Sequence, residues 1–195
     1  MIVEGSGQQR RFSAEGQFRA RNPHMRGTTS LLRLVFSLGL GTDHASEFLP
    51  LQDGATHIFD AFALVNFLLC SALAPGSPAP SRSFSEKTLR GGKSGRSTTT
   101  MQENCFEHFL QTIEILDPTL VVTQGKSVRS WIGRRLDVSP LGGPTVERCC
   151  IRGRWVPLVS LSHPSARFPH NWGANEHTPY LLNTVMPAVQ TARQH

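Results

Sequence analysis

The chain has few cysteines, a single tyrosine, little charge and no long apolar run. Four of its 195 residues are cysteine and 17% are charged. The longest apolar stretch, residues 58–73, contains Asp60 and Asn66 and is shorter than the roughly 20 residues that a membrane-spanning helix needs. These shortages exclude a disulfide-rich scaffold and a transmembrane helix. A hydrophobic content of 38% excludes a disordered chain, so we expect one globular domain over residues 1–195.

The first residues do not resemble a secretory signal. Residues 1–3 lead directly into Glu4 and a glycine cluster, without a basic start or a long apolar stretch. We therefore expect a cytoplasmic protein with no membrane partner, and a monomer. Adjacent cysteines such as Cys149 and Cys150 are poor disulfide partners for each other, so free thiols or metal ligands are expected.

Positive charge is concentrated in three segments. The formal net charge is +6 and the isoelectric point is near 9.8, and 17 of the 20 cations are arginine. Residues 1–33, 74–100 and 126–195 are net positive, whereas residues 34–73 and 101–125 carry only acids. Arginine suits bidentate contacts with phosphate, which predicts a polyanionic partner, although a GC-rich genome explains the arginine excess equally well. Residues 74–100, rich in Pro, Ser and Gly, are predicted to be a basic low-complexity insert.

Predicted strands and helices alternate along the rest of the chain. Apolar runs that end at polar or glycine residues predict strands at 1–3, 61–67, 120–123 and 155–161. Helical spacing predicts helices capped by Thr28, Thr29 and Ser30, over 106–116 before Pro118, and from Thr178-Pro179 onward with a kink at Pro187. This alternation favours an α/β fold with a mostly parallel sheet covered on both faces. Ligands of such sheets bind at the carboxyl ends of the strands, where Glu4, Asn66, Gln124 and His163 would lie.

The order of these residues resembles the uracil-DNA glycosylase superfamily. Glu4-Gly5-Ser6-Gly7 is similar to the GEAPG motif of its iron–sulfur branch, and Phe18 follows at the place of a stacking aromatic. Asn66 resembles the strand-end asparagine that reads uracil, residues 105–125 resemble the helix–strand–glycine unit, and His163-Pro164-Ser165 matches the HPS motif. The resemblance implies a three-layer α/β/α sandwich that flips uracil out of DNA and hydrolyses its N-glycosidic bond, leaving an abasic site.

The resemblance also implies a role for each matched residue. Glu4 would activate water, and His163 would donate a hydrogen bond to uracil O2 as negative charge develops there. An asparagine amide matches both O4 and N3–H of uracil, so Asn66 would select the base, with Gly5 and Phe18 completing the pocket. DNA contacts are expected from Gly125, Lys126, Ser165, Arg167 and Phe168. Uracil-containing DNA, single-stranded or mismatched, would be the partner, and free uracil the product.

No cofactor is expected. Cys70 and Cys105 fall where the iron–sulfur branch has its last two cluster ligands, but a [4Fe-4S] cluster normally needs four thiolates. Cys105 and His108 are one helical turn apart and could ligate zinc, yet the favoured interpretation is that Cys105 packs or is a relic of the cluster site.

Departures from the motifs keep alternatives open. Val3 replaces the first glycine of GEAPG and Ser6 replaces its proline, so Glu4 is equally well interpreted as a solvated carboxylate. The main alternative is a catalytically weak or inactive relative that binds uracil or abasic DNA. A serine hydrolase using Ser162 or Ser165 is a weaker alternative because neither residue lies in a G-x-S-x-G elbow.

Overall fold

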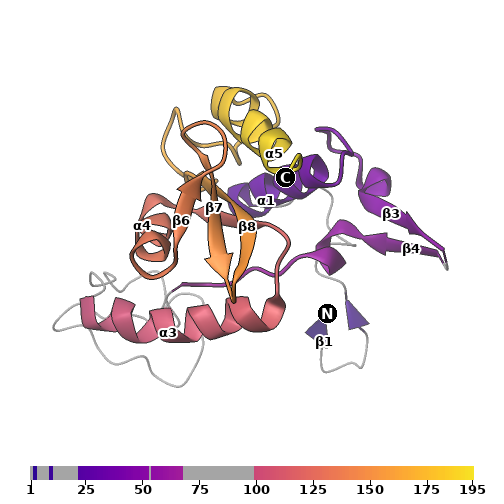
Figure 1. Ribbon diagram of the computed structural model, residues 1–195. Helices are drawn as coiled ribbons and strands as arrows, with labels where there is room; N and C mark the ends of the chain where they lie inside the picture. Colours follow the sequence, from indigo (N-terminus) through magenta and orange to yellow (C-terminus); the bar gives the residue numbers. More distant parts are fainter. Residues whose placement is uncertain (1, 4–8, 11–21, 53, 68–98) are drawn as a thin grey trace, which may run out of the picture. The chain divides into compact units, whose positions relative to one another are not determined.

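The computed structural model describes residues 2–3, 9–10, 22–52, 54–67 and 99–195 (Figure 1). The chain forms two compact units. The first comprises Met1–Ala63 and Pro118–His195, and the second comprises Leu64–Asp117. Within the described residues, no helix is both long enough and apolar enough to cross a membrane.

The first unit is built on a mixed four-stranded sheet, so the chain is a mixed α/β protein. The strands are β5 (Val121–Gln124), β6 (Val138–Pro140), β7 (Val146–Ile151) and β8 (Arg154–Leu161), in the order β5-β8-β7-β6. Only the β5–β8 pairing is parallel in this sheet; β7 pairs antiparallel with both β8 and β6. The strands predicted at 120–123 and 155–161 are confirmed, but the expectation of a mostly parallel sheet is wrong for the described strands.

A tight hairpin accounts for this difference. Ile151 pairs with Arg154, so Arg152 and Gly153 form a two-residue loop between β7 and β8. Both loop residues have positive φ, at 50° and 80°. Such turns match the twist of antiparallel strands, and glycine makes the second position accessible. The loop therefore reverses the chain where a parallel crossover had been expected.

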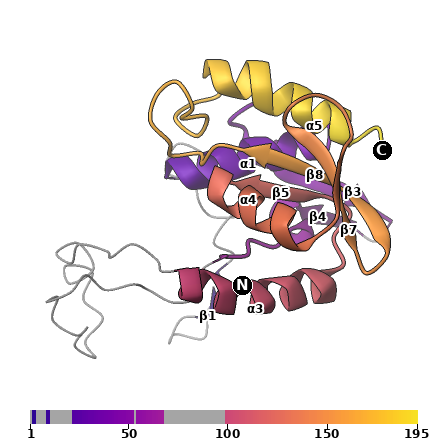
Figure 2. The ribbon, with the colours of Figure 1, turned by 60° about the vertical axis from the view of Figure 1, so that its left-hand side comes forward.

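Helices pack against the sheet of the first unit (Figure 2). Helices α1 (Pro23–Val35) and α5 (Met186–Ala192) pack with the sheet in one core. That core contains Leu31, Leu34, Val146, Val159, Leu161, Trp172, Leu181, Val185, Ala188, Val189 and Ala192. Glu147 follows Val146 in the strand and so points to the opposite face, where it pairs with Arg129 of α4 (Lys126–Arg135).

Helix α1 begins earlier than predicted. Asn22 is its N-cap and accepts a hydrogen bond from the Met25 N–H at 2.9 Å, and Pro23 occupies the first turn. Asn followed by Pro is a strong start signal because the amide caps the helix and proline needs no N–H partner there. The predicted caps, Thr28 and Thr29 among them, are buried inside the helix, so that prediction is wrong.

Two short antiparallel strand pairs are formed by the N-terminal segment of the first unit. β1 (Ile2–Val3) pairs with β2 (Gln9–Arg10), and β3 (Phe48–Leu51) pairs with β4 (Gly54–His57). Two 3₁₀ helices flank the second hairpin, at His44–Glu47 and Ile58–Ala61.

The strand predicted at 61–67 does not form. A capping box precedes it: the His57 ring accepts from the Phe59 N–H, and the Asp60 carboxylate accepts from the His57 N–H. This arrangement starts a 3₁₀ turn, and residues 62–67 continue in neither helix nor strand. The expected buried strand is therefore replaced by a partly exposed segment.

The second unit contains α3 (Thr99–Leu116), which confirms the helix predicted over 106–116. It ends before Pro118, as its sequence predicts. The ring of Phe67 meets Phe106 and Phe109 at centroid distances of 5.9 and 5.6 Å. The end of the predicted insert belongs to this helix, and residues 74–98 lie outside the described part.

The C-terminal helix begins at Pro179, as predicted, and contains a π-helical turn over Leu181–Val185 before α5. The Met186 N–H bonds to Leu181 O, five residues back. Pro187 follows directly and has no N–H to donate, so the wider turn lies where proline would disturb an ordinary helix.

Candidate functional site

Of the predicted site residues that the structure describes in the first unit, Gly125, Lys126 and His163 lie at one edge of its sheet. The parallel strands β5 and β8 end there, at Gln124 and Leu161. The Gly125 N–H donates to Leu161 O at 2.8 Å, which ties the two strand ends together. Gly125 has φ 138°, a conformation that favours glycine, and it is the N-cap of α4. The edge therefore combines two strand ends with a helix N-terminus.

His163 follows the end of β8 and has a defined tautomer. Its Nδ1 accepts the backbone N–H of Ser165 at 3.1 Å, so in the neutral ring the proton is on Nε2. The side chain is exposed, and no group in the described part of the chain accepts a hydrogen bond from Nε2. His163 thus presents a neutral N–H donor at the carboxyl edge of the sheet.

The environment of His163 favours that neutral form. Partial burial lowers the pKa of His163, and the nearby charge of His24 lowers it further. The two imidazole rings have centroids 4.9 Å apart and are tilted by 34°. A proton on His163 would also need to displace the Ser165 N–H from Nδ1, so protonation and the local turn oppose each other.

A hydrogen-bonded chain links α1 to β5 beside this ring. Nε2 of His24 lies 2.6 Å from Oε1 of Gln124, and the Gln124 amide donates to Thr28 Oγ1 at 3.2 Å. Since the Gln124 NH₂ serves Thr28, its carbonyl oxygen faces His24, whose Nε2 must carry the proton. Both ends of the Gln124 amide are therefore engaged within the protein.

The sequence prediction missed His24. Its place in the first turn of α1 follows from the Asn22-Pro23 start signal, which begins the helix before Thr28 to Ser30. Gln124 was recognised as a strand-end residue but was given no role.

The loop after His163 carries the predicted DNA contacts. Ser165, Arg167 and Phe168 are exposed, and the Phe168 side chain is 78% exposed. Ala166 N–H bonds to His163 O, and His170 N–H bonds to Arg167 O, so the loop is a succession of turns. An exposed aromatic beside an arginine is suited to stacking on a base or filling a gap in a duplex.

Buried groups fix the base of this loop. The indole N–H of Trp172 donates to Ser162 O at 2.8 Å, and Trp172 is fully buried. The Ser162 hydroxyl donates to His170 O at 2.8 Å, and the Tyr180 hydroxyl accepts from the Ser162 N–H. Trp172 therefore acts as the anchor of the loop.

Helix α1 approaches the loop very closely. A Cβ added at Gly27 would lie 2.6 Å from Cβ of Pro164, and one added at Gly173 would overlap the Pro23 carbonyl. The Arg26 side chain donates to Gly173 O at 3.0 Å. Glycine at these positions allows the start of α1 to lie against the His163 turn.

Of the remaining predicted residues, three are described by the structure and four are not. Lys126 is exposed in the first turn of α4, whereas the Gly125 N–H is already used by Leu161. Asn66 belongs to the second unit and is exposed there. The other predicted residues, Glu4, Gly5, Phe18 and Cys70, lie outside the described residues.

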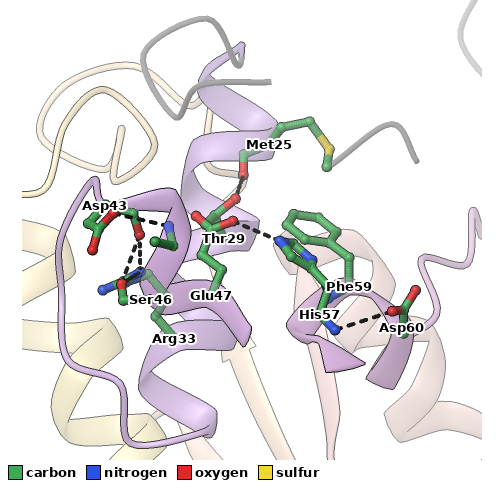
Figure 3. Close-up of polar contacts among 10 residues, drawn as sticks. Met25, Thr29, Arg33, Asp43, Ser46, Glu47, His57, Phe59 and Asp60 are labelled. Atoms are coloured by element: carbon green, nitrogen blue, oxygen red, sulfur yellow. Dashed lines mark hydrogen bonds and ion pairs between the residues drawn. The ribbon is translucent and has the colours of Figure 1, made fainter. Parts of the chain in front are cut away.

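A second polar cluster is buried in the first unit (Figure 3). His57 Nε2 lies 3.0 Å from Oε2 of Glu47, and both side chains are fully buried. His57 Nδ1 accepts the Phe59 N–H, so Nε2 carries the proton and donates to the carboxylate. Arg33 is also buried and donates to Gly39 O, Asp43 O and the Ser46 hydroxyl. These contacts join α1 to the segment before β3.

Metal ligation finds no support among the described residues, which contain no group of three or more His, Cys, Asp or Glu side chains able to hold an ion. Cys105 is buried. Burial also raises the pKa of the Cys149 thiol to about 11, so this cysteine is a neutral thiol at physiological pH.

Comparisons of the chain with protein-family models, curated proteins and solved structures found no match. Function must therefore be inferred from the residues and their geometry.

Proposed function

We propose that this protein is a uracil-DNA glycosylase that hydrolyses the N-glycosidic bond of uracil in DNA. The observation that supports this most directly is the fixed tautomer of His163, whose Nδ1 accepts from Ser165 and whose Nε2–H has no acceptor among the described residues. The donor lies at the carboxyl ends of two parallel strands, where α/β proteins bind their ligands.

The chemistry of the reaction calls for such a donor. When the glycosidic bond breaks, negative charge develops on uracil and positive charge on the sugar. A neutral N–H held in place stabilises the anion without adding a proton to the site. The N-terminus of α4, which begins beside the same strand ends, carries a partial positive charge that acts in the same direction.

The finer fold that we propose is a three-layer α/β/α sandwich. It is supported by α1 and α5 on one face of the sheet and by the ion pair between Arg129 of α4 and Glu147 on the other. In this fold the His163 loop borders the DNA-binding edge.

Base selection and water activation rest on the motif resemblance. Asn66 would read O4 and N3–H of uracil, Phe18 would stack on the base, and Glu4 would orient the attacking water. Phe168 would occupy the space left by the flipped base, and Arg167 and Lys126 would contact phosphates. The protein would act as a monomer in cytoplasmic DNA repair.

The experiment is strand scission at abasic sites. The full chain is incubated with single-stranded, U·A and U·G oligonucleotides, followed by alkali, with thymine oligonucleotides as the substrate control. We expect cleavage at uracil only, and its loss in His163→Asn. Asparagine keeps an acceptor for the Ser165 N–H but lacks the Nε2 donor. The matched control is His177→Asn, at an exposed histidine of the following loop.

The outcomes separate the alternatives. Absence of cleavage at protein excess, with retained binding to uracil-containing DNA, would show a binding relative instead of an enzyme. Cleavage by His163→Asn at the wild-type rate would show that the anion is stabilised by another group.

A further inference from the structure

The second histidine of the site, His24, is held by hydrogen bonds beside the His163 ring. It lies in the first turn of α1, 100 residues before the strand end that holds it. Its bond to Gln124 is 2.6 Å long, and Gln124 is itself held by Thr28 of the same helix. His24, Gln124 and Thr28 form a closed chain, which fixes the His24 ring relative to both α1 and β5.

We propose that His24 is a positioning residue for His163: held by Gln124 against the neighbouring imidazole, it keeps that ring oriented with Nδ1 toward the Ser165 N–H. The ring centroids lie 4.9 Å apart, within the range of direct aromatic contact. Rotation of the His163 ring would break the Ser165 bond and would meet a neighbour that cannot move without breaking its own bond to Gln124. The orientation of the donor is therefore set from α1.

Electrostatics supports the same conclusion. Burial and the charge of His24 both lower the pKa of His163. A proton added at Nδ1 would face the Ser165 N–H, so protonation would release the turn that begins the DNA-contacting loop. His24 thus preserves this turn toward lower pH.

Other charged or titratable groups lie on the elements around His163. They are Arg26 on α1, Lys126 at the start of α4, Arg167 and His170 on the loop, and Tyr180 at the start of the C-terminal helix. Arg26 donates to Gly173 O, and the Tyr180 hydroxyl accepts from the Ser162 N–H. Among the described residues, His24 is the one whose charge shifts the pKa of His163.

The catalytic part of this inference rests on the proposed function, but the structural part can be tested without substrate. In the full chain labelled with ¹⁵N-histidine, two-bond ¹H–¹⁵N spectra report the tautomer and titration of each imidazole. The His163 signals are assigned by their loss in His163→Asn.

Two variants separate the anchor from the charge. His24→Gln removes the ring and its charge but keeps an amide donor for Gln124 Oε1 and a long side chain beside His163, whereas His24→Ala removes the donor and the bulk as well. We expect His163 to titrate at higher pH in both variants. Only His24→Ala should lose the fixed Nε2–H tautomer and shift the Ser165 amide. His177→Ala, the control, should change neither signal.

A second measurement is the pH profile of uracil release. Its acid limb should move to higher pH in His24→Gln, in step with the titration of His163. Wild-type protein that releases no uracil would refute the proposed function and leave the spectroscopic test intact. His163 titrating at the wild-type pH in both His24 variants, or keeping its tautomer in His24→Ala, would overturn the positioning role.

Discussion

His57 and His163 share the same local hydrogen bond at Nδ1 but differ in burial and in the partner of Nε2. In each, Nδ1 accepts the backbone N–H two residues ahead, from Phe59 and from Ser165. The Nε2 proton of His57 is donated to Glu47, and both side chains are fully buried. That of His163 has no acceptor among the described residues. The same turn therefore has both ring nitrogens engaged at His57, and at His163 it leaves Nε2 without an acceptor among the described residues.

The difference concerns which hydrogen bonds of a histidine are explained by the fold. A buried polar group with every hydrogen bond satisfied is explained by the fold. At His163, Nε2 has no acceptor among the described residues, and in the proposed function this nitrogen donates to the ligand. Matched changes at the two sites test this distinction.

The largest effect is expected from His57→Asn. Asparagine can still accept the Phe59 N–H, but it cannot reach Glu47, whose buried carboxylate loses the hydrogen bond from His57. Removing a hydrogen bond from a buried polar group lowers the free energy of unfolding by about 1–3 kcal/mol, and by more when that group is charged. Urea denaturation of the variant measures this, with His177→Asn as the exposed control. A loss no larger than that of the control would mean that Glu47 is satisfied by other groups.

A smaller effect is expected from Gly27→Ala. The new methyl group would lie 2.6 Å from Cβ of Pro164, so α1 and the His163 turn must move apart. Such overpacking lowers the free energy of unfolding by about 1–3 kcal/mol, and the His163 imidazole signals should shift with it. Gly133→Ala is the control, because its nearest neighbour is the flexible end of the Arg129 side chain. Equal stabilities of the two variants would show that the close approach is not required.

His163→Asn should change stability much less. The position is exposed, and the asparagine side chain can replace Nδ1 as acceptor of the Ser165 N–H. We expect the free energy of unfolding to stay within about 0.5 kcal/mol of wild type. A loss of several kcal/mol in the free energy of unfolding in the same urea experiment would show that His163, like His57, is needed for the stability of the fold.

The smallest effect is a pH dependence of stability. The pKa of His163 is lowered in the folded protein, so below about pH 6.5, the ordinary histidine value, the unfolded chain binds the proton first. The stabilising contribution is complete above that pH and is lost as the pH falls through the folded pKa. Unfolding measured at pH 7.5 and 5 should therefore show a smaller decrease in His163→Asn than in wild type. An equal decrease in the free energy of unfolding of both proteins would show that His163 does not contribute to the pH dependence of stability.

Local signals in the sequence were sufficient for much of the fold. Periodic apolar residues predicted α3, and apolar runs ending at Gly125 and His163 predicted β5 and β8. These elements depend on burial of one face, which a sequence records directly. The hairpin of β7 and β8 depends on a two-residue turn at Arg152-Gly153, which is only a weak turn signal in the sequence.

The site was only partly predictable for a similar reason. His163 and Gly125 were found because they directly follow strands. His24 was not predicted, because its position beside His163 depends on a hydrogen bond to a residue 100 positions away. The strand predicted around Asn66 failed because the capping box of His57 and Asp60 competes locally with extended structure.

The strand order carries a consequence for how the protein folds. β6, β7 and β8 form a local meander within residues 138–161, and such contacts of low sequence separation form early. The β5–β8 pairing must close a longer loop of chain than the meander does. The contact between His24 and Gln124 must close a still longer loop. We therefore expect the edge that carries His163 to assemble last, so that its completed hydrogen bonds mark the final step of folding of the first unit.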